Sequence, residues 1–199
     1  ALHGGPDGEA RNPLFYVSNS PWNLYDLLAQ FFRLHGIPVG PVLFLRNWGV
    51  TRHEFLPTNQ LKHKLPIVRQ LLDTHVDLPF ILIGDSGEAD PELYEEIVQT
   101  YGDRILAVYI RNVNAEDSER TRAIEALAAE VLEAGSTMVL AEDSLTLARH
   151  AAEHGWIARS ALTVIETEKK RDEAPPSPLK ELLGSKKDEA SAVVVEEDA

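Results

Sequence analysis

Short apolar runs alternate with longer segments of helical periodicity along the first 155 residues of this 199-residue chain. The apolar runs have the length and composition of strands buried in a parallel sheet. They lie at residues 13–17, 42–45, 80–83, 104–110 and 137–140. The segments at 23–35, 60–75, 91–101, 118–134 and 145–154 repeat apolar residues every three or four positions, as amphipathic helices do. This alternation predicts an α/β fold with a doubly wound, Rossmann-like parallel sheet.

The chain divides into three parts by composition. Residues 1–12 are rich in glycine and polar residues, which predicts a loop. Residues 13–165 carry the alternating pattern and form the predicted domain. Residues 166–199 are acidic, contain Pro175-Pro176-Ser177-Pro178 and offer little apolar surface to bury, so they predict a disordered tail.

Charge and composition exclude several kinds of protein. The net charge of −13 argues against non-specific binding of nucleic acid, and it makes an anionic substrate unfavourable unless a cation lies between. The absence of cysteine excludes a disulfide framework and a thiolate metal site. No apolar run approaches the roughly 20 residues of a transmembrane helix. The first residues also lack the pattern of a signal peptide, so we expect a cytoplasmic protein without a transmembrane segment.

Two aspartates follow the apolar run at 80–83, within Gly84-Asp85-Ser86-Gly87-Glu88-Ala89-Asp90. The next helix is predicted to begin near Pro91, because proline is favoured in a first helical turn. Asp85 and Asp90 would therefore lie at the carboxyl end of a strand, where open α/β sheets bind their ligands. Carboxylates suit Mg²⁺, so Asp85 is predicted to contact the ion and Asp90 to support it. The alternative is that both acids only stabilise the N-terminus of the helix.

A serine and a lysine lie at comparable places. Ser18 follows the run at 13–17, and its hydroxyl could hold a phosphoryl oxygen. The alternative is a cap of the following helix, a role for which Ser20 is the better candidate. Lys64 lies near the start of the helix at 60–75, where the helix dipole does not favour a cation. That position favours a role in neutralising a phosphate, and the alternative is an ordinary solvated lysine.

Strand and serine, helix and lysine, then strand and Gly-Asp-x-x-x-x-Asp, in this order, resemble motifs two, three and four of the haloacid dehalogenase superfamily. A closer similarity is to the catalytic domain of the actin-patch-type phosphatidate phosphatases, and it runs from about Asn12 to Ile157. The segments that carry it are Phe15-Tyr16-Val17-Ser18-Asn19-Ser20-Pro21-Trp22, Leu45-Arg46-Asn47-Trp48-Gly49, His63-Lys64, Ile81-Leu82-Ile83-Gly84-Asp85-Ser86-Gly87-Glu88, Asp90-Pro91-Glu92-Leu93-Tyr94 and Ala107-Val108-Tyr109-Ile110-Arg111.

The resemblance implies a Mg²⁺-dependent phosphatase that hydrolyses a phosphomonoester through an aspartyl-phosphate, with phosphatidate at a membrane surface as the implied substrate. It implies that Ser18, with the N–H of Asn19 beside it, binds a phosphoryl oxygen. Lys64 would balance the charge between nucleophile and phosphate. Asp85 would bind Mg²⁺, and Asp90 would support it.

The same resemblance points to a substrate mouth near the second predicted strand. Arg46 and Trp48 would help to form it, although Trp48 could equally be a packing residue. The chain departs from the family at Asn47, where related sequences often carry aspartate.

In that family the nucleophile and the general acid–base are aspartates of an Asp-x-Asp motif, which precedes all of these segments. This sequence contains no Asp-x-Asp: Asp7 lies in the glycine-rich loop and Asp26 in a predicted helix. We therefore expect the C-terminal portion of a catalytic domain, truncated before its first strand and inactive alone. The alternatives are a non-catalytic module that binds phosphate or metal, and a phosphatase of a small soluble phosphometabolite.

Overall fold

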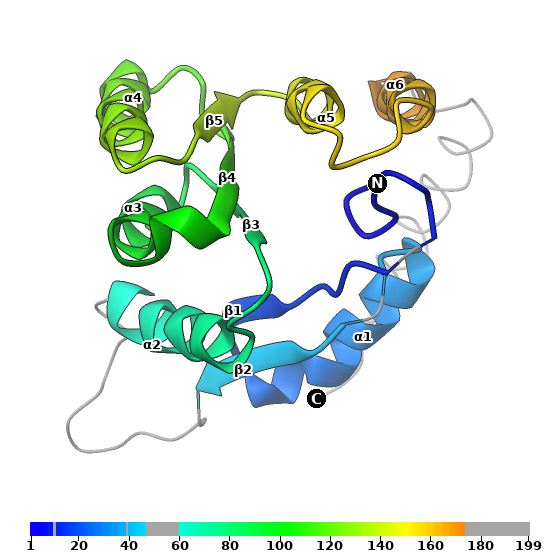
Figure 1. Ribbon diagram of the computed structural model, residues 1–199. Helices are drawn as coiled ribbons and strands as arrows, with labels where there is room; N and C mark the ends of the chain where they lie inside the picture. The colour runs from blue at the N-terminus through cyan, green and yellow to red at the C-terminus, as the bar shows by residue number, and fades with distance from the viewer. Residues whose placement is uncertain (10, 39, 47–59, 174–199) are drawn as a thin grey trace, which may run out of the picture.

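The computed structural model describes residues 1–9, 11–38, 40–46 and 60–173 (Figure 1). The described elements, in chain order, are β1 (Tyr16–Pro21), the 3₁₀ turn η1 (Trp22–Leu24), α1 (Tyr25–Leu34), β2 (Val42–Arg46), α2 (Gln60–Thr74), β3 (Phe80–Asp85), α3 (Asp90–Tyr101), the 3₁₀ turn η2 (Gly102–Arg104), β4 (Ile105–Arg111), α4 (Ser118–Glu133), β5 (Met138–Ala141), α5 (Ser144–Glu153) and α6 (Ala161–Glu173). The strands and helices predicted from the sequence are all present, so the α/β class is confirmed. None of the helices in these ranges has the length and hydropathy that a bilayer crossing requires.

Local sequence explains where several helices begin and end. Pro91 occupies the first turn of α3, as predicted. Gly36, Gly135 and Gly155 have φ angles of 62°, 88° and 74° just after α1, α4 and α5, a conformation that other residues rarely adopt. Asp143 accepts the N–H of Thr146 at 2.8 Å and caps α5.

The described strands form two parallel sheets, one of β1 and β2 and the other in the order β3-β4-β5. In the first, Tyr16 lies beside Val42 and Pro21 beside Arg46. In the second, Asp85 lies beside Arg111, which in turn lies beside Ala141. Neither β1 nor β3 has a strand on its other edge within the described residues.

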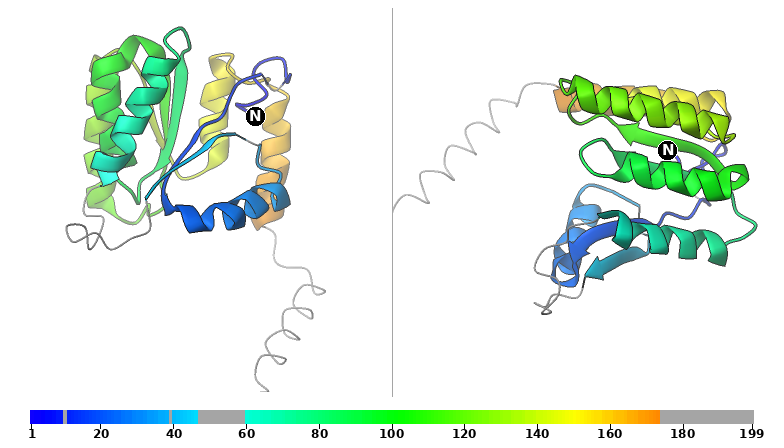
Figure 2. Two further views of the ribbon diagram at one scale, coloured as in Figure 1. Left: turned by 90° about the horizontal axis from the view of Figure 1, so that it is seen from below. Right: turned by 90° about the vertical axis from the view of Figure 1, so that its left-hand side faces the viewer.

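Helices cover both sides of the strands. Helices α2, α3 and α4 lie on one side, and α1, α5 and α6 lie on the other (Figures 1 and 2). Strand β4 lies between β3 and β5, and its side chains are buried on both faces of the sheet. Val108 and Ile110 belong to the core under α3 and α4, whereas Ala107 and Tyr109 pack with α5.

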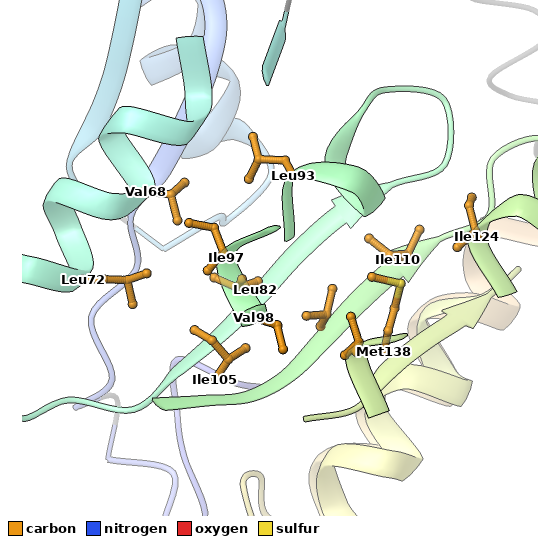
Figure 3. Close-up of a cluster of buried hydrophobic side chains, with 12 residues drawn as sticks. Val68, Leu72, Leu82, Leu93, Ile97, Val98, Ile105, Ile110, Ile124 and Met138 are labelled. Atoms are coloured by element: carbon orange, nitrogen blue, oxygen red, sulfur yellow. The ribbon is translucent and has the colours of Figure 1, made fainter. Parts of the chain in front are cut away.

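The main core lies between the three-stranded sheet and helices α2, α3 and α4 (Figure 3). Leu72, Ile97 and Ile124, one from each helix, have no solvent exposure. Val17 of β1 is half-buried against the same cluster. Helix α2 therefore contacts both the two-stranded and the three-stranded sheet.

Helix α1 has no such partner among the described residues, because none of its side chains is buried. Phe32 packs on Tyr16 of β1, with ring centroids 4.8 Å apart. The side chains of Leu27, Phe31 and Leu34 are 63%, 47% and 81% exposed. The helix thus presents an apolar face to solvent.

Two boundaries differ from the sequence expectations. Strand β1 begins at Tyr16 rather than residue 13, and it ends at Pro21 rather than residue 17, since Ser18 and Pro21 still pair with β2 on either side of a register shift. Helix α6 runs to Glu173, so a disordered tail that begins at Glu166 is wrong for residues 166–173. Leu162 and Ile165 pack on the α5 cluster, and Arg149 pairs with Glu166 at 3.3 Å, which holds this segment in place. Residues 174–199 lie outside the described residues.

Candidate functional site

The site begins where β3 ends and turns into α3. Asp85 is the last residue of β3, and one oxygen of its side chain, Oδ1, accepts the N–H groups of Gly87 and Glu88 at 2.8 and 3.2 Å. These bonds fold residues 85–88 into a tight turn, which we call the Asp85 loop. The second oxygen, Oδ2, accepts no hydrogen bond from the described residues. Asp85 therefore has one oxygen committed to the loop and one open to a ligand.

Asp90, the first residue of α3, lies directly against the end of β3. Its side chain is buried, and Oδ2 accepts the N–H of Asp85 at 3.3 Å. A Cβ atom at Gly84 would lie 2.5 Å from both the Cβ and the Oδ2 of Asp90, which is closer than a carbon atom approaches a non-bonded neighbour. Glycine at position 84 is thus what lets the Asp90 carboxylate approach the strand.

Lys64 of α2 completes a cluster of charged groups. The lysine is buried, and its Nζ donates to Asp90 Oδ1 at 2.7 Å and to Glu88 Oε2 at 2.5 Å. An ammonium group has three N–H donors. Two are used by these carboxylates, and among the described residues the third has no protein acceptor. Lys64 is therefore not the ordinary solvated lysine that the sequence left open.

Burial and pairing act together on these groups. Burial lowers the pKa of Lys64, but the hydrogen bonds and charges of Asp90 and Glu88 outweigh it, so that the pKa is raised. Burial raises the pKa of Asp90, and the bond to Lys64 opposes only part of that rise. Both groups hold their protons more firmly than they would in water.

The donor set fits a hard, partly hydrated cation. Asp85 offers an open carboxylate oxygen, and Asp90 lies beside it with Oδ1 and Oδ2 already accepting bonds from Lys64 and from the N–H of Asp85. Within the described residues, no group of three or more histidine, cysteine, aspartate or glutamate side chains could hold a metal ion by itself. Mg²⁺ commonly binds through one or two carboxylates, with water and phosphate oxygens as its other ligands. Residues Asp85 and Asp90 could hold Mg²⁺ in this way.

Ser18 lies on the other sheet, inside β1 rather than after the strand, where the sequence placed it. Its Oγ donates to Ser20 Oγ at 2.9 Å and accepts the N–H of Ser20 at 3.0 Å. In the described part of the chain, no hydrogen bond joins Ser18 to the cluster around Lys64. Neither serine caps α1, whose N-cap residue is Leu24.

The structure describes the remaining residues of the predicted site only in part or not at all. Asn19 and Arg46 have places in β1 and β2, but their side chains are not among those described. Asn47 and Trp48 lie outside the described residues. The structure thus brings Lys64, Asp85 and Asp90 together, and among the described residues no hydrogen bond joins Ser18 to them.

The sequence did not single out Arg120, on α4. Its Nε donates to the carbonyl oxygen of Ser86 at 3.0 Å, and its Nη2 donates to that of Glu88 at 2.9 Å. The same guanidinium binds both carboxylate oxygens of Glu92 on α3. This pairing lowers the pKa of Glu92. The only sequence signal was position, because the start of α4 follows the strand next to β3.

A second set of bonds ties the loop to the end of β4. Ser86 Oγ donates to Asn112 Oδ1 at 3.1 Å and accepts the N–H of Val113 at 3.0 Å. The N–H of Ser86 donates to the carbonyl oxygen of Arg111 at 2.9 Å. Ser86 and Asn112 are both buried, so these bonds are shielded from water.

Comparison with known proteins gives matches over the first half of the chain. Residues 3–112 match the profile of the family described as phosphatidate phosphatase APP1, catalytic domain. Phosphatidate phosphatase APP1 of Saccharomyces cerevisiae is 36% identical over 97 residues, which are 49% of this chain and 16% of that protein. An uncharacterized protein of Schizosaccharomyces pombe, C29B5.04c, is 35% identical over 104 residues, 51% of this chain and 16% of that protein. The chain therefore covers only a small share of these relatives, and no solved structure matches it.

Proposed function

The chain belongs to the family of phosphatidate phosphatase APP1 catalytic domains, and we propose that it supplies the cation-binding and phosphate-binding part of a Mg²⁺-dependent phosphomonoesterase. The observation that carries the proposal is the buried contact of Lys64 with Asp90, directly beside Asp85 at the end of β3. A buried lysine next to a carboxylate with an open oxygen is suited to bind a cation and a phosphate together.

Each residue has a distinct part in this proposal. Asp85, through its open oxygen, and Asp90 would hold Mg²⁺. The ion, when bound, would offset the negative charge of the phosphoryl group. Lys64 would direct its third N–H to a phosphate oxygen. Ser18 would hydrogen-bond another phosphoryl oxygen once β1 and β3 are joined in one sheet.

We place the nucleophilic aspartate outside these 199 residues, since they contain no Asp-x-Asp. Among the described residues no strand pairs with the outer edges of β1 and β3, and this supports the placement, because a parallel strand between them would make one continuous sheet. That strand would complete a haloacid dehalogenase-like fold and bring its aspartate to the carboxylate cluster. The phosphoryl group would then pass to that aspartate before water releases it, which divides one difficult displacement into two easier ones.

The proposed substrate is a lipid phosphate of the phosphatidate class. This assignment rests on the family and on the name of the S. cerevisiae relative. The alternative is a small soluble phosphometabolite. Phosphate release from phosphatidate in mixed micelles, measured against release from soluble sugar phosphates, separates the two.

The experiment joins the chain to a preceding segment that carries the Asp-x-Asp strand of a family member and measures Mg²⁺-dependent phosphate release. Asp85→Asn should abolish release, whereas Asp103→Asn, a matched change of an exposed aspartate in η2, should leave it unchanged. Full activity of Asp85→Asn would contradict the proposed metal role.

A second candidate function is favoured by the absence of Asp-x-Asp alone. It is a module that binds a phosphate ester or Mg²⁺ without turnover. Binding with no phosphate release, in a protein that already contains the Asp-x-Asp strand, would select this function over the first.

A further inference from the structure

The side chain of Arg120, on α4, binds the backbone of the Asp85 loop. Its Nε and Nη2 donate to the carbonyl oxygens of Ser86 and Glu88, so two points on either side of Gly87 are fixed by one side chain. These carbonyls belong to residues one and three positions after Asp85, whose own side chain binds the amides of the same turn. The amide groups of the loop are therefore bound by Asp85, and its carbonyl groups are bound by Arg120.

The guanidinium is itself fixed in place. Glu92, in the first turn of α3, accepts from both Nη atoms. The backbone N–H of Arg120 donates to Asp117, the cap of α4, at 3.0 Å. Only a quarter of the Arg120 side chain is exposed. A planar guanidinium that is held by a bidentate carboxylate can keep two carbonyl oxygens in a set geometry.

We infer that Arg120 is a positioning residue for the site: it acts through the backbone of the Asp85 loop to keep the open carboxylate oxygen of Asp85 directed for cation binding. This inference rests on the proposed function, since it takes Asp85 to be a metal ligand. Arg120 does not touch the cation or the phosphate. Arg120 would instead fix the orientation of a metal ligand, as do the hydrogen bonds that surround the ligands of other metal sites.

The competing explanation is that Arg120 has only a structural role and links α4 to α3 through its salt bridge with Glu92. Arg120→Lys separates the two roles. Lysine keeps the positive charge and can still pair with Glu92, but its single ammonium group cannot reproduce the fork that binds two carbonyl oxygens and a carboxylate together. Under a structural role alone, Arg120→Lys would leave cation affinity unchanged.

The test measures Mn²⁺ binding to the 199-residue chain by isothermal titration calorimetry, together with the midpoint of thermal unfolding. Arg120→Lys and Arg120→Gln should each raise the Mn²⁺ dissociation constant by about 10-fold or more. The matched control is Arg122→Gln, because Arg122 is exposed on the same helix and its Nε donates only to Ser118 of its own helix. The control should bind Mn²⁺ as the unaltered chain does. If Arg120→Gln does not fold, Arg120→Lys carries the test.

Asp85→Asn distinguishes failure of this inference from failure of the proposed function. Loss of Mn²⁺ binding in Asp85→Asn with unaltered binding in both Arg120 variants would overturn the role of Arg120 and leave the metal site standing. Unaltered binding in Asp85→Asn, or no binding by the unaltered chain, would overturn the proposed metal site and the inference with it.

Discussion

The three-stranded sheet with its helices and the two-stranded unit of β1, β2 and α1 differ in how completely they are packed. Strand β4 is buried from Ala107 to Ile110, and the helices on both sides of it contribute fully buried side chains. Helix α1 buries none of its side chains, and Leu34 is 81% exposed. Figure 1 shows the two strand groups as separate units of the same molecule.

This difference in packing separates the proposed site residues whose positions are fixed by buried contacts from the one whose position is not. Lys64, Asp85 and Asp90 stand on the packed part, where buried bonds fix their positions. Ser18 stands on the less packed part, and its hydroxyl binds only the neighbouring Ser20 among the described residues. Lys64, Asp85 and Asp90, the proposed cation-binding group, are thus held in place, whereas no such bonds hold Ser18 against them among the described residues.

The largest expected loss of stability tests whether the cluster of Lys64, Glu88 and Asp90 is buried in the well-packed part of the molecule. Lys64→Met leaves the carboxylate of Asp90 buried without its cation, and we expect a loss of about 3–5 kcal/mol in the free energy of unfolding at neutral pH. Arg69→Met is the matched control, because Arg69 lies on the same helix and its salt bridge to Glu96 joins two side chains that are 40% and 47% exposed. It should cost about 1 kcal/mol or less, as urea denaturation can measure. Equal losses would show that the cluster is not buried in solution.

The same variant has a predicted pH dependence. Burial already raises the pKa of Asp90 in the unaltered chain, and removal of the Lys64 charge should raise it further. A carboxyl group with a raised pKa favours folding at low pH, and that stability is lost as pH rises through the folded-state pKa. The penalty of Lys64→Met should therefore shrink between about pH 8 and about pH 4. A penalty that grows on acidification would contradict the buried position of Asp90.

The same leucine-to-alanine substitution, made once in the main core and once on α1, compares the packing of the two parts directly. Leu93→Ala empties a place in the main core where leucine is 1% exposed, and it should cost about 2–5 kcal/mol. Leu34→Ala, on the exposed face of α1, should change stability by about 0.5 kcal/mol or less. Urea denaturation of both variants checks this. A similar cost at the two positions would show that α1 is packed against something in solution and would break the comparison.

A smaller effect is expected at the close approach of β3 and α3. Gly84→Ala places a Cβ atom 2.5 Å from the Asp90 side chain and should cost about 1–3 kcal/mol. Gly87→Ala, whose Cβ would lie 3.1 Å from Asp85 Oδ1 and from Val113 Cγ2, should cost less. Thermal unfolding ranks the two. A larger loss at Gly87 would mean that the loop, rather than the Asp90 contact, is the tightest point of the site.

The sequence predicted the features that depend on local patterns. Apolar runs and helical periodicity located the elements, and the strand-to-helix turn after residue 83 located Asp85 and Asp90. What it missed depends on contacts between distant residues. Helix α6 extends past Glu166 because Ile165 packs on α5, and β1 continues beyond Val17 because Ser18 and Pro21 pair with β2. Arg120 binds backbone carbonyls 32 and 34 residues away, which no residue pattern encodes.

Native-state amide hydrogen exchange tests the central claim most directly, because it reports the stability of each part of the chain separately. The account predicts that the amides of Val108, Tyr109 and Ile110 in β4 exchange only through global unfolding. It predicts that the amides of α1 and of Tyr16 in β1 exchange more than about tenfold faster, through local opening of the two-stranded unit. Equal protection of α1 and β4 would contradict the account, since it would show that the two parts of the molecule unfold as one.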